Sequence, residues 1–212
     1  MKGKILLGKT RKGLKYQPQD YYFKEAKKQG FVARSAFKLE ELDKKYHLFF
    51  SGMKVLDLGC APGSWLQYAA KKVGPSGKLW GIDLDPVRIE LPNVKTFEGD
   101  LMALDPKDPR ILEGAPYDII QSDAMTKTTG IADSDCARSI ALVEQGIKLA
   151  EQGILKVGGI FLAKVFEGPD FTPFYVEFKR KFKGCSVNRP EATRQGSREV
   201  YILGKEFRGN AT

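Results

Sequence analysis

The sequence predicts an α/β fold, in which helices cover both faces of a mostly parallel β-sheet. Short apolar segments with strand character alternate with longer segments of helical periodicity along most of the 212 residues. Strands separated by helices pair in parallel, because each crossover returns the chain to the same edge of the sheet. The sequence has no internal repeat or long linker, so we expect a single domain over residues 20–212 after a basic extension over residues 1–19.

The individual elements follow from apolar periodicity and from turn residues. Asp20–Gln29 predicts a first helix that stops at Gly30, and Ser35 is expected to cap a second helix that runs to about Tyr46. Further helices are expected at Ser64–Val73, Asp135–Glu151 and Phe171–Lys181. The seven expected strands are Lys54–Leu58, Lys78–Ile82, Val94–Phe97, Tyr117–Gln121, Gly158–Val165, Cys185–Asn188 and Glu199–Leu203.

Composition limits the classes of function. Hydrophobic residues make up 42% of the chain and charged residues 29%, and no apolar run approaches the roughly 18 residues needed to span a bilayer. The three cysteines, Cys60, Cys136 and Cys185, are widely spaced, which argues against a disulfide framework or a clustered metal site. The single histidine, His47, cannot form a zinc site alone. We therefore expect a cytoplasmic protein with no metal and no membrane association.

The net charge of +9 is concentrated in two clusters. One opens the chain and contains no acidic residue, and the other lies near the C-terminus. They consist of Lys2, Lys4, Lys9, Arg11, Lys12 and Lys15, and of Lys179, Arg180, Lys181, Lys183, Arg189, Arg194 and Arg198. Such clusters attract polyanions, so nucleic acid is one interpretation and solvated surface charge is the other.

A glycine-bearing turn follows the first expected strand. Gly59 and Gly63 allow the backbone to approach a ligand closely, but their G-x-x-x-G spacing differs from the dinucleotide fingerprint. Asp57 lies at the end of the strand, where a carboxylate suits a ligand with an amino-acid ammonium group. An ordinary strand-to-helix turn is the alternative interpretation.

Two later acidic residues follow the next two strands. Asp83 lies about 20 residues beyond the glycine turn, where a carboxylate can accept hydrogen bonds from both hydroxyls of a ribose. Asp100 follows the third strand and can accept a hydrogen bond from an adenine amino group. Each alone is more typical of a loop or cap residue. Their recurrence with Asp57 at consecutive strand ends indicates a nucleoside site.

Four charged residues fall where burial is expensive. Lys164 interrupts the apolar strand Gly158–Val165, and Asp123 follows the fourth strand. Glu199 opens the last strand, and Lys38 lies in the first turn of the second helix, where a cation opposes the helix dipole. Each alone suits an ordinary ion pair. Together they can orient a hydroxyl and stabilise an oxyanion, as methyl transfer to an alcohol requires.

Several of these segments resemble one enzyme family. Gly30–Glu40, the loop Leu56–Trp65, Lys164-Val-Phe and Ser197–Tyr201 are similar to the FtsJ/RrmJ ribose 2′-O-methyltransferases, in order and over nearly the whole chain. The resemblance implies a Rossmann-like class I methyltransferase fold, whose seven-stranded sheet has an antiparallel last strand. It further implies S-adenosylmethionine as cofactor and RNA as partner.

The resemblance also assigns roles to particular residues. The catalytic tetrad of the family falls on Lys38, Asp123, Lys164 and Glu199, with Lys164 acting either as a base or as a cation beside the forming alkoxide. The implied cofactor contacts are Gly59, Ala61, Gly63, Trp65, Asp83, Asp100 and Asp123. For Trp65, packing in the core is the alternative.

The expected substrate is a uridine of large-subunit ribosomal RNA, free or in the assembled subunit, and the expected state is a monomer. The alternatives are a transfer RNA anticodon loop, a messenger cap, methylation of a base, and a non-catalytic RNA-binding or ribosome-assembly module. A nicotinamide oxidoreductase is disfavoured by the glycine spacing. One departure from bacterial relatives is Ser122-Asp-Ala-Met-Thr-Lys127, which replaces a Ser-Asp-x-x-Pro-Asn pattern and leaves the shape of this loop open.

Overall fold

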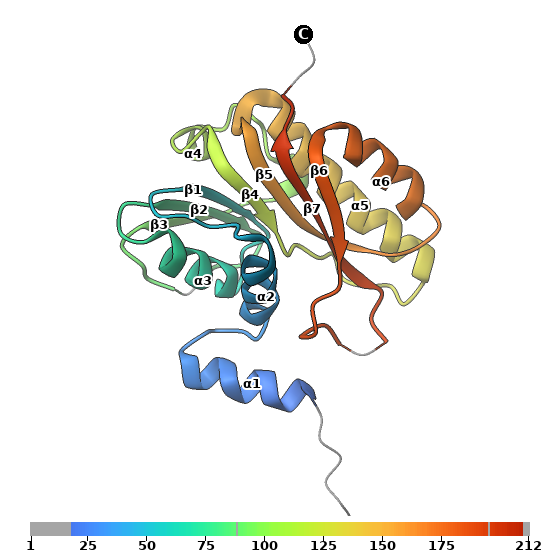
Figure 1. Cartoon of the computed structure of the whole chain (residues 1–212), viewed down its shortest axis with the longest axis horizontal. Coiled ribbons are helices and arrows are strands. Elements are labelled where there is room, and N and C mark those ends of the chain that lie inside the picture. Colours follow the sequence, from blue (N-terminus) through green and yellow to red (C-terminus); the bar gives the residue numbers. More distant parts are fainter. Residues whose placement is uncertain (1–17, 88, 195, 210–212) are drawn as a thin grey trace, which may run out of the picture.

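The computed structural model describes residues 18–87, 89–194 and 196–209, with side chains from Tyr21 onward, so the basic cluster from Lys2 to Lys15 lies outside it. Within these residues seven strands form one sheet of order β3-β2-β1-β4-β5-β7-β6 (Figure 1). β7 is antiparallel to β5 and β6, and the other pairings are parallel. The strands are β1 (Lys54–Leu58), β2 (Lys78–Asp83), β3 (Val94–Glu98), β4 (Tyr117–Ser122), β5 (Leu155–Phe166), β6 (Phe182–Asn188) and β7 (Glu199–Phe207).

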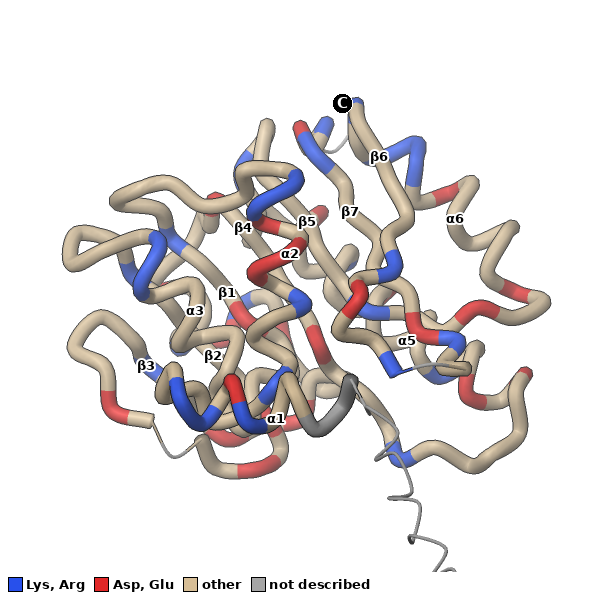
Figure 2. The backbone as a smooth tube through the Cα atoms, turned by 60° about the horizontal axis from the view of Figure 1, so that its bottom comes forward, with Lys and Arg blue, Asp and Glu red and all other residues tan. Residues whose placement is uncertain are grey.

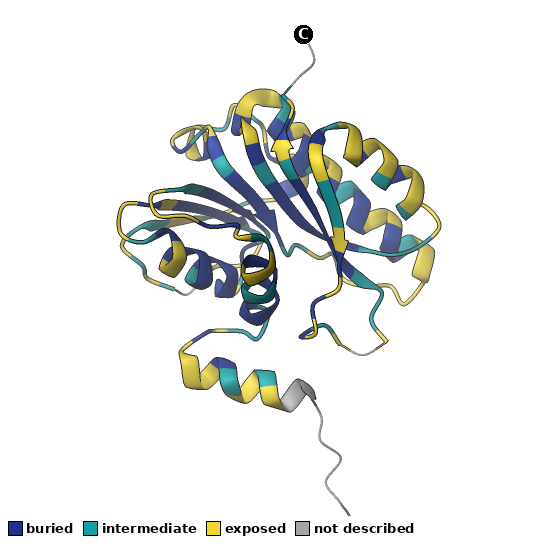
Figure 3. Ribbon diagram, in the orientation of Figure 1, coloured by how far each residue is buried: buried dark blue, intermediate teal, exposed yellow. Residues whose placement is uncertain are grey.

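Helices cover both faces of this sheet, as predicted. The first face carries α1 (Pro18–Gln29), α2 (Ala36–Tyr46) and α3 (Ser64–Val73). The second face carries η1 (Leu101–Ala103), α4 (Pro109–Leu112), α5 (Ala132–Leu149), its π-helical extension η2 (Ala150–Ile154) and α6 (Phe171–Arg180). Buried residues concentrate in the sheet and on the inward sides of these helices (Figure 3).

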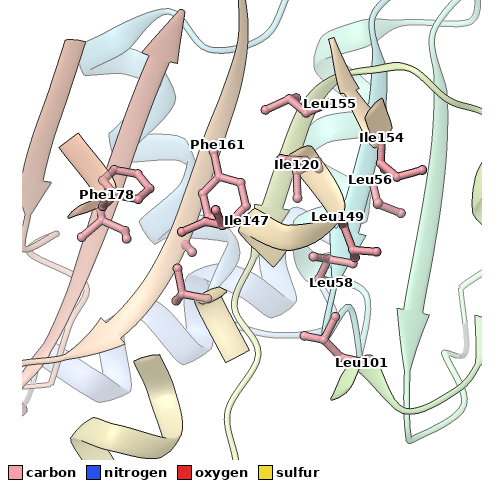
Figure 4. Close-up of a cluster of buried hydrophobic side chains, with 14 of the residues drawn as sticks. Leu56, Leu58, Leu101, Ile120, Ile147, Leu149, Ile154, Leu155, Phe161 and Phe178 are labelled. Carbon is pink, nitrogen blue, oxygen red and sulfur yellow. The ribbon is translucent and has the colours of Figure 1, made fainter. Parts of the chain in front are cut away.

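Strand periodicity divides the core into two layers. On β5, Phe161, Ala163 and Val165 pack under α5 and α6, whereas Leu162 packs on the face that α2 and α3 cover. The second-face layer is shown in Figure 4, where Phe161 lies among Ile147, Ile120 and Phe178. Since side chains alternate along a strand, Lys164 shares the face of Leu162 and is directed toward the α2 side.

The strand order places a switch point between β1 and β4. From β1 the chain adds β2 and β3 on one side, and it then returns to β4 on the other side of β1. At such a point the loops after the two strands separate and leave a crevice. Gly59 follows β1 and Asp123 follows β4, so the glycine turn and the fourth-strand acid both border this crevice.

The predicted strands are confirmed, with small differences at their ends. β5 begins three residues earlier than expected, because Leu155 pairs with Tyr117 before a register shift in the β4–β5 ladder. The short helices η1 and α4 were not predicted; Asp100 and Asp108 cap them with their side chains. The expected side-chain cap by Ser35 is wrong. Ser35 has helical backbone angles, and its hydroxyl lies 2.7 Å from that of Ser64 instead.

Among the described residues no helix combines the length and the apolar character that crossing a lipid bilayer requires. Nor, in that part of the chain, are three or more His, Cys, Asp or Glu side chains arranged so that they could hold a metal ion together.

The core position of Phe161 gives a test of the fold. Its ring is fully buried between Phe178 and Phe182. We expect Phe161→Ala to lower the free energy of unfolding by about 3–5 kcal/mol, because the loss of buried contacts adds to the cost of a cavity. Val157, on the same strand and 72% exposed, provides the control. Val157→Ala should change the free energy of unfolding by less than about 0.5 kcal/mol. Urea denaturation measures both, and equal effects would contradict the two-layer core.

Candidate active site

A pocket of about 420 Å³ lies at the carboxyl ends of β1, β2 and β4. This volume is within the usual range for small-molecule sites. Its lining includes five of the residues predicted to contact the cofactor, namely Gly59, Ala61, Asp83, Asp100 and Asp123. Lys164 also lines it. The residues that the sequence assigned to the cofactor and to catalysis therefore meet at one place.

The glycine turn shapes one wall of the pocket. Gly59 has a φ of +76°, and a Cβ on it would lie 2.4 Å from the Cβ of Ala124. No larger residue fits here unless the loop after β4 moves. Ala124 belongs to Ser122–Lys127, the segment whose loop shape the sequence left open, and its neighbours Met125 and Thr126 line the pocket. This segment therefore forms part of the pocket wall.

The described lining of the pocket is acidic, with Lys164 as its one cationic residue. Four aspartates contribute to it, Asp83, Asp85, Asp100 and Asp123. Asp83 accepts hydrogen bonds from the amides of Ala61 (2.8 Å) and Asp85 (3.0 Å), which fix its carboxylate at the end of β2. Asp100 accepts from the amide of Met102 (2.8 Å), so it caps η1 and also faces the pocket. This lining favours a cationic ligand.

Apolar side chains complete the pocket, and sequence reasoning missed them. They are Ile82, Leu84, Leu101, Met102, Met125 and Leu142. Nothing in their residue types marks them, because apolar residues beside strand ends are ordinary. An apolar wall next to carboxylates suits an adenosine moiety, since the ring packs on the wall while the hydroxyls and the amino group donate hydrogen bonds.

Beneath the glycine turn lies a carboxyl group that has no contact with solvent. Asp57 accepts a hydrogen bond from Gln121 Nε2 at 3.0 Å through Oδ2, and its Oδ1 has no hydrogen-bond partner among the described residues. Burial, opposed by this hydrogen bond, and the nearby charges of Asp123 and Asp83 raise the pKa of Asp57 to about 8. A cation bound nearby would stabilise its ionised form.

Lys164 and Asp123, two of the four residues predicted to be catalytic, form an ion pair. Lys164 Nζ lies 3.1 Å from Asp123 Oδ1 and donates a hydrogen bond to the Asp123 carbonyl oxygen at 2.6 Å. The lysine side chain is 7% exposed and that of Asp123 is 19% exposed. A lysine so deeply placed needs such oxygen contacts to offset its lost hydration.

The other two predicted catalytic residues form a second ion pair. Lys38 Nζ of α2 lies 2.5 Å from Glu199 Oε1 at the start of β7. Their side chains are 11% and 13% exposed. Because β7 is antiparallel, its first residue lies at the same edge as the carboxyl ends of β4 and β5. This reversal brings Glu199 to Asp123.

Tyr201 joins the two ion pairs, and the sequence analysis did not assign it to the site. Its hydroxyl lies 2.9 Å from Asp123 Oδ1, 2.8 Å from Glu199 Oε1 and 3.2 Å from Lys38 Nζ. Burial, Asp123 and Glu199 raise the pKa of this phenol well above its usual value, so it remains a donor. Its position could have indicated its role, because Tyr201 lies two residues after Glu199 and so on the same face of β7. Tyr201 also pairs with Lys164 in the β5–β7 ladder.

Contacts between α2 and α3 hold Lys38 in place. The Ser35 hydroxyl contacts that of Ser64, and the Ser35 carbonyl accepts a hydrogen bond from Trp65 Nε1 at 3.0 Å. The indole of Trp65 is 2% exposed and packs 5.8 Å from the Tyr201 ring. Neither Trp65 nor Gly63 is among the pocket-lining residues. Trp65 thus packs in the core, where it contacts the Tyr201 ring and the segment that precedes Lys38.

Basic side chains border the same edge of the sheet. Arg34 precedes α2, and Arg194 and Arg198 lie in the connection between β6 and β7. The pKa of Arg34 is lowered by partial burial and by the charge of Arg194, and the charge of Glu199 opposes this shift. Arg198 lies 4.0 Å from Asp135, whereas within the described ranges neither Arg34 nor Arg194 forms an ion pair. Basic side chains at this edge suit a polyanion.

Comparison with known proteins places the chain among methyltransferases. The sequence pattern of the FtsJ-like methyltransferases matches residues 31–207. Two relatives are described as ribosomal RNA large subunit methyltransferase E. The one from Bdellovibrio bacteriovorus is 42% identical over 191 residues, which cover 89% of this chain and 97% of the relative. The one from Anaeromyxobacter dehalogenans is 46% identical over 198 residues, which cover 92% of this chain and 74% of the relative.

A solved structure supports the same grouping. A protein from Plasmodium falciparum, described as a ribosomal RNA methyltransferase, is 29% identical and superposes with a TM-score of 0.72. The match covers 85% of this chain and all of that one.

The buried carboxyl of Asp57 predicts a pH dependence of stability. The folded state keeps this proton up to about pH 8, whereas the unfolded chain releases it near pH 4. We therefore expect the free energy of unfolding, relative to that of Asp57→Asn, to fall between about pH 4 and pH 8 and then to level off. Urea denaturation across this range measures it. Asp85→Asn, at an exposed position, is the control, and parallel profiles for wild type and Asp57→Asn would contradict the assignment.

Proposed function

The chain belongs to the FtsJ-like methyltransferase family, and from this premise we propose that it methylates the ribose 2′-hydroxyl of a uridine in large-subunit ribosomal RNA. The observation that carries the proposal is the pair of buried lysine–carboxylate contacts, Lys164 with Asp123 and Lys38 with Glu199, beside an acidic pocket. The relatives that suggest the ribosomal substrate align with this chain over most of its length. Such a substrate fits the expected cytoplasmic location.

The proposed cofactor is S-adenosylmethionine, a cation with an amino-acid tail and an adenosine group. Its bound form supplies a methyl group on an electrophilic sulfonium. Asp83 is assigned to the ribose hydroxyls and Asp100 to the adenine amino group, and both line the pocket. Gly59 and Ala61 are assigned to the cofactor as well, and both line the pocket. The negative charge of Asp83 and Asp123 at the pocket favours the cation, and a bound cation would in turn favour the ionised form of Asp57.

On the acceptor side, Asp123 and Glu199 orient the 2′-hydroxyl, and one of these carboxylates accepts its proton as the oxygen takes up the methyl group. Lys164 Nζ donates a hydrogen bond to the Asp123 carbonyl oxygen and forms an ion pair with Asp123 Oδ1, so its ammonium group is held beside the carboxylate that orients the hydroxyl. We assign Lys164 the role of a cation that stabilises the forming alkoxide. Lys38 and Tyr201 hold the carboxylates of Glu199 and Asp123 in position through hydrogen bonds.

RNA as the acceptor is supported by charge around the site. Arg34 and Arg194 border the catalytic residues, and the chain carries a net charge of +9. A phosphodiester backbone would supply the anions that these side chains lack. The monomeric state remains an expectation.

The catalytic role of Lys164 can be tested directly. We expect Lys164→Ala to lower the rate of methyl transfer at least about a hundredfold, because the forming oxyanion loses its stabilising donor. Binding of S-adenosylmethionine, measured by calorimetry, should be largely retained. Lys156, on the same strand but in a surface ion pair with Asp118, is the matched control: Lys156→Ala should turn over like wild type. Near-wild-type turnover by Lys164→Ala would show that Lys164 does not stabilise the forming alkoxide.

The substrate can be tested in the cell. We expect deletion of the gene to remove one 2′-O-methyluridine from large-subunit ribosomal RNA and to leave transfer RNA unchanged. Mass-spectrometric mapping of ribose methylation in total RNA measures this, with a plasmid copy of the wild type as the restoring control and Lys164→Ala as the non-restoring one. If 2′-O-methylation were lost only from transfer RNA, the substrate would be an anticodon loop and not ribosomal RNA.

A further inference from the structure

The helix α1 presents an unusual outer surface. Phe23 is 55% exposed and Tyr21 is 50% exposed, although aromatic rings are costly to leave in water. Lysines alternate with them along the solvent-facing side: Lys27 Nζ lies 4.7 Å from the centre of the Phe23 ring, and Lys24 and Lys28 follow Tyr21 by one and two turns. We call Tyr21, Phe23, Lys24, Lys27 and Lys28 the α1 face.

The inner side of α1 is firmly attached to the domain. Tyr22 packs 5.5 Å from the Phe37 ring, and Ala26 is buried. The connection to α2 is tied to α3 at two points, because Gln67 accepts a hydrogen bond from the Val32 amide at 2.8 Å and donates one to the Gly30 carbonyl at 3.1 Å. The α1 face is therefore held in a fixed place and is not covered by the rest of the described chain.

That place borders the catalytic residues. Phe37, against which Tyr22 packs, immediately precedes Lys38 on α2. Figure 1 shows α1 next to α2, at the end of the molecule where β7 begins. A strand of RNA whose ribose reaches Lys38 and Lys164 has its neighbouring nucleotides on this side of the molecule.

The charge of the helix identifies the kind of partner. Its described charged side chains are Lys24, Lys27 and Lys28 against the single Glu25, which already contacts Lys28 at 3.8 Å and Gln29 at 2.8 Å. Figure 2 shows this excess of basic positions along α1. In the sequence, the helix is preceded by six basic residues and no acidic one over residues 1–15. Exposed rings interleaved with cations match unpaired nucleic acid, whose bases stack on aromatic side chains while lysines meet the phosphates.

Resting on the proposed function, we propose that the α1 face binds unpaired nucleotides that flank the methylated ribose, with Phe23 and Tyr21 as stacking platforms. Bases in a duplex offer no free faces to these rings, so the contribution is specific to single-stranded RNA. The face tolerates any base, because stacking does not read hydrogen-bonding edges.

Fluorescence anisotropy with a labelled oligouridylate and with a blunt RNA duplex of equal length tests this. We expect the double variant Tyr21→Ala, Phe23→Ala to bind the oligouridylate about tenfold more weakly than wild type and the duplex within about twofold. Val157→Ala removes an exposed apolar side chain at the start of β5, so it should bind both like wild type. Thermal unfolding monitored by circular dichroism confirms that the double variant is folded.

Three outcomes would overturn the inference: wild-type affinity of the double variant for the oligouridylate, an equal loss on the duplex, or binding of the wild type to phosphatidylglycerol vesicles but not to RNA. Methyl transfer to ribosomal RNA is assayed separately with the wild type. If the wild type did not methylate ribosomal RNA, the proposed function would be wrong. The anisotropy data would still decide whether the α1 face binds single-stranded RNA.

Discussion

The structure depends on the burial of two lysines against two carboxylates at one edge of the sheet. Lys38 and Lys164 are almost fully enclosed, and an unpaired ammonium in such a place would cost several kcal/mol. Asp123 and Glu199 balance their charge one for one. Each of the four comes from a different part of the fold, namely α2, the loop after β4, β5 and β7, so the charge balance is met only when all four are in place.

This requirement explains the antiparallel last strand in physical terms. A parallel β7 would begin at the opposite edge of the sheet and would carry Glu199 away from Lys38. Reversal brings Glu199 and, two residues later, Tyr201 onto the face that α2 covers. The phenol then bridges carboxylates that would otherwise repel each other. Asp123 belongs both to this network and to the lining of the pocket, so one side chain joins the buried charges to the pocket.

The sequence predicted the parts of the fold and site that residue type reveals. Lys164 stood out because a lysine interrupts an apolar strand, and the strands were visible because their apolar runs are bounded by turns. Tyr201 was missed because a tyrosine in a strand is ordinary, and only the register with Lys164 shows its role. Ser35 was expected to cap its own helix, but a hydroxyl forms whichever contact the fold supplies, here Ser64. Trp65 shows the same difficulty, since one indole suits a pocket or a core equally and tertiary packing placed its ring in the core.

The chemistry of the site and the choice of RNA have different physical origins. In the proposed reaction, Lys164, Asp123 and Glu199 act on the ribose, which every ribonucleotide carries, so this network would not distinguish one RNA from another. We therefore assign discrimination to the loops and to α1, outside the sheet, where bases and phosphates around the target would be met. Such surfaces can change without disturbing the buried charge balance: Ala124, Met125 and Thr126 line the pocket, whereas Asp123 is held by Lys164 and Tyr201. The buried charges therefore bear on the reaction, and the substrate has to be inferred from what surrounds them.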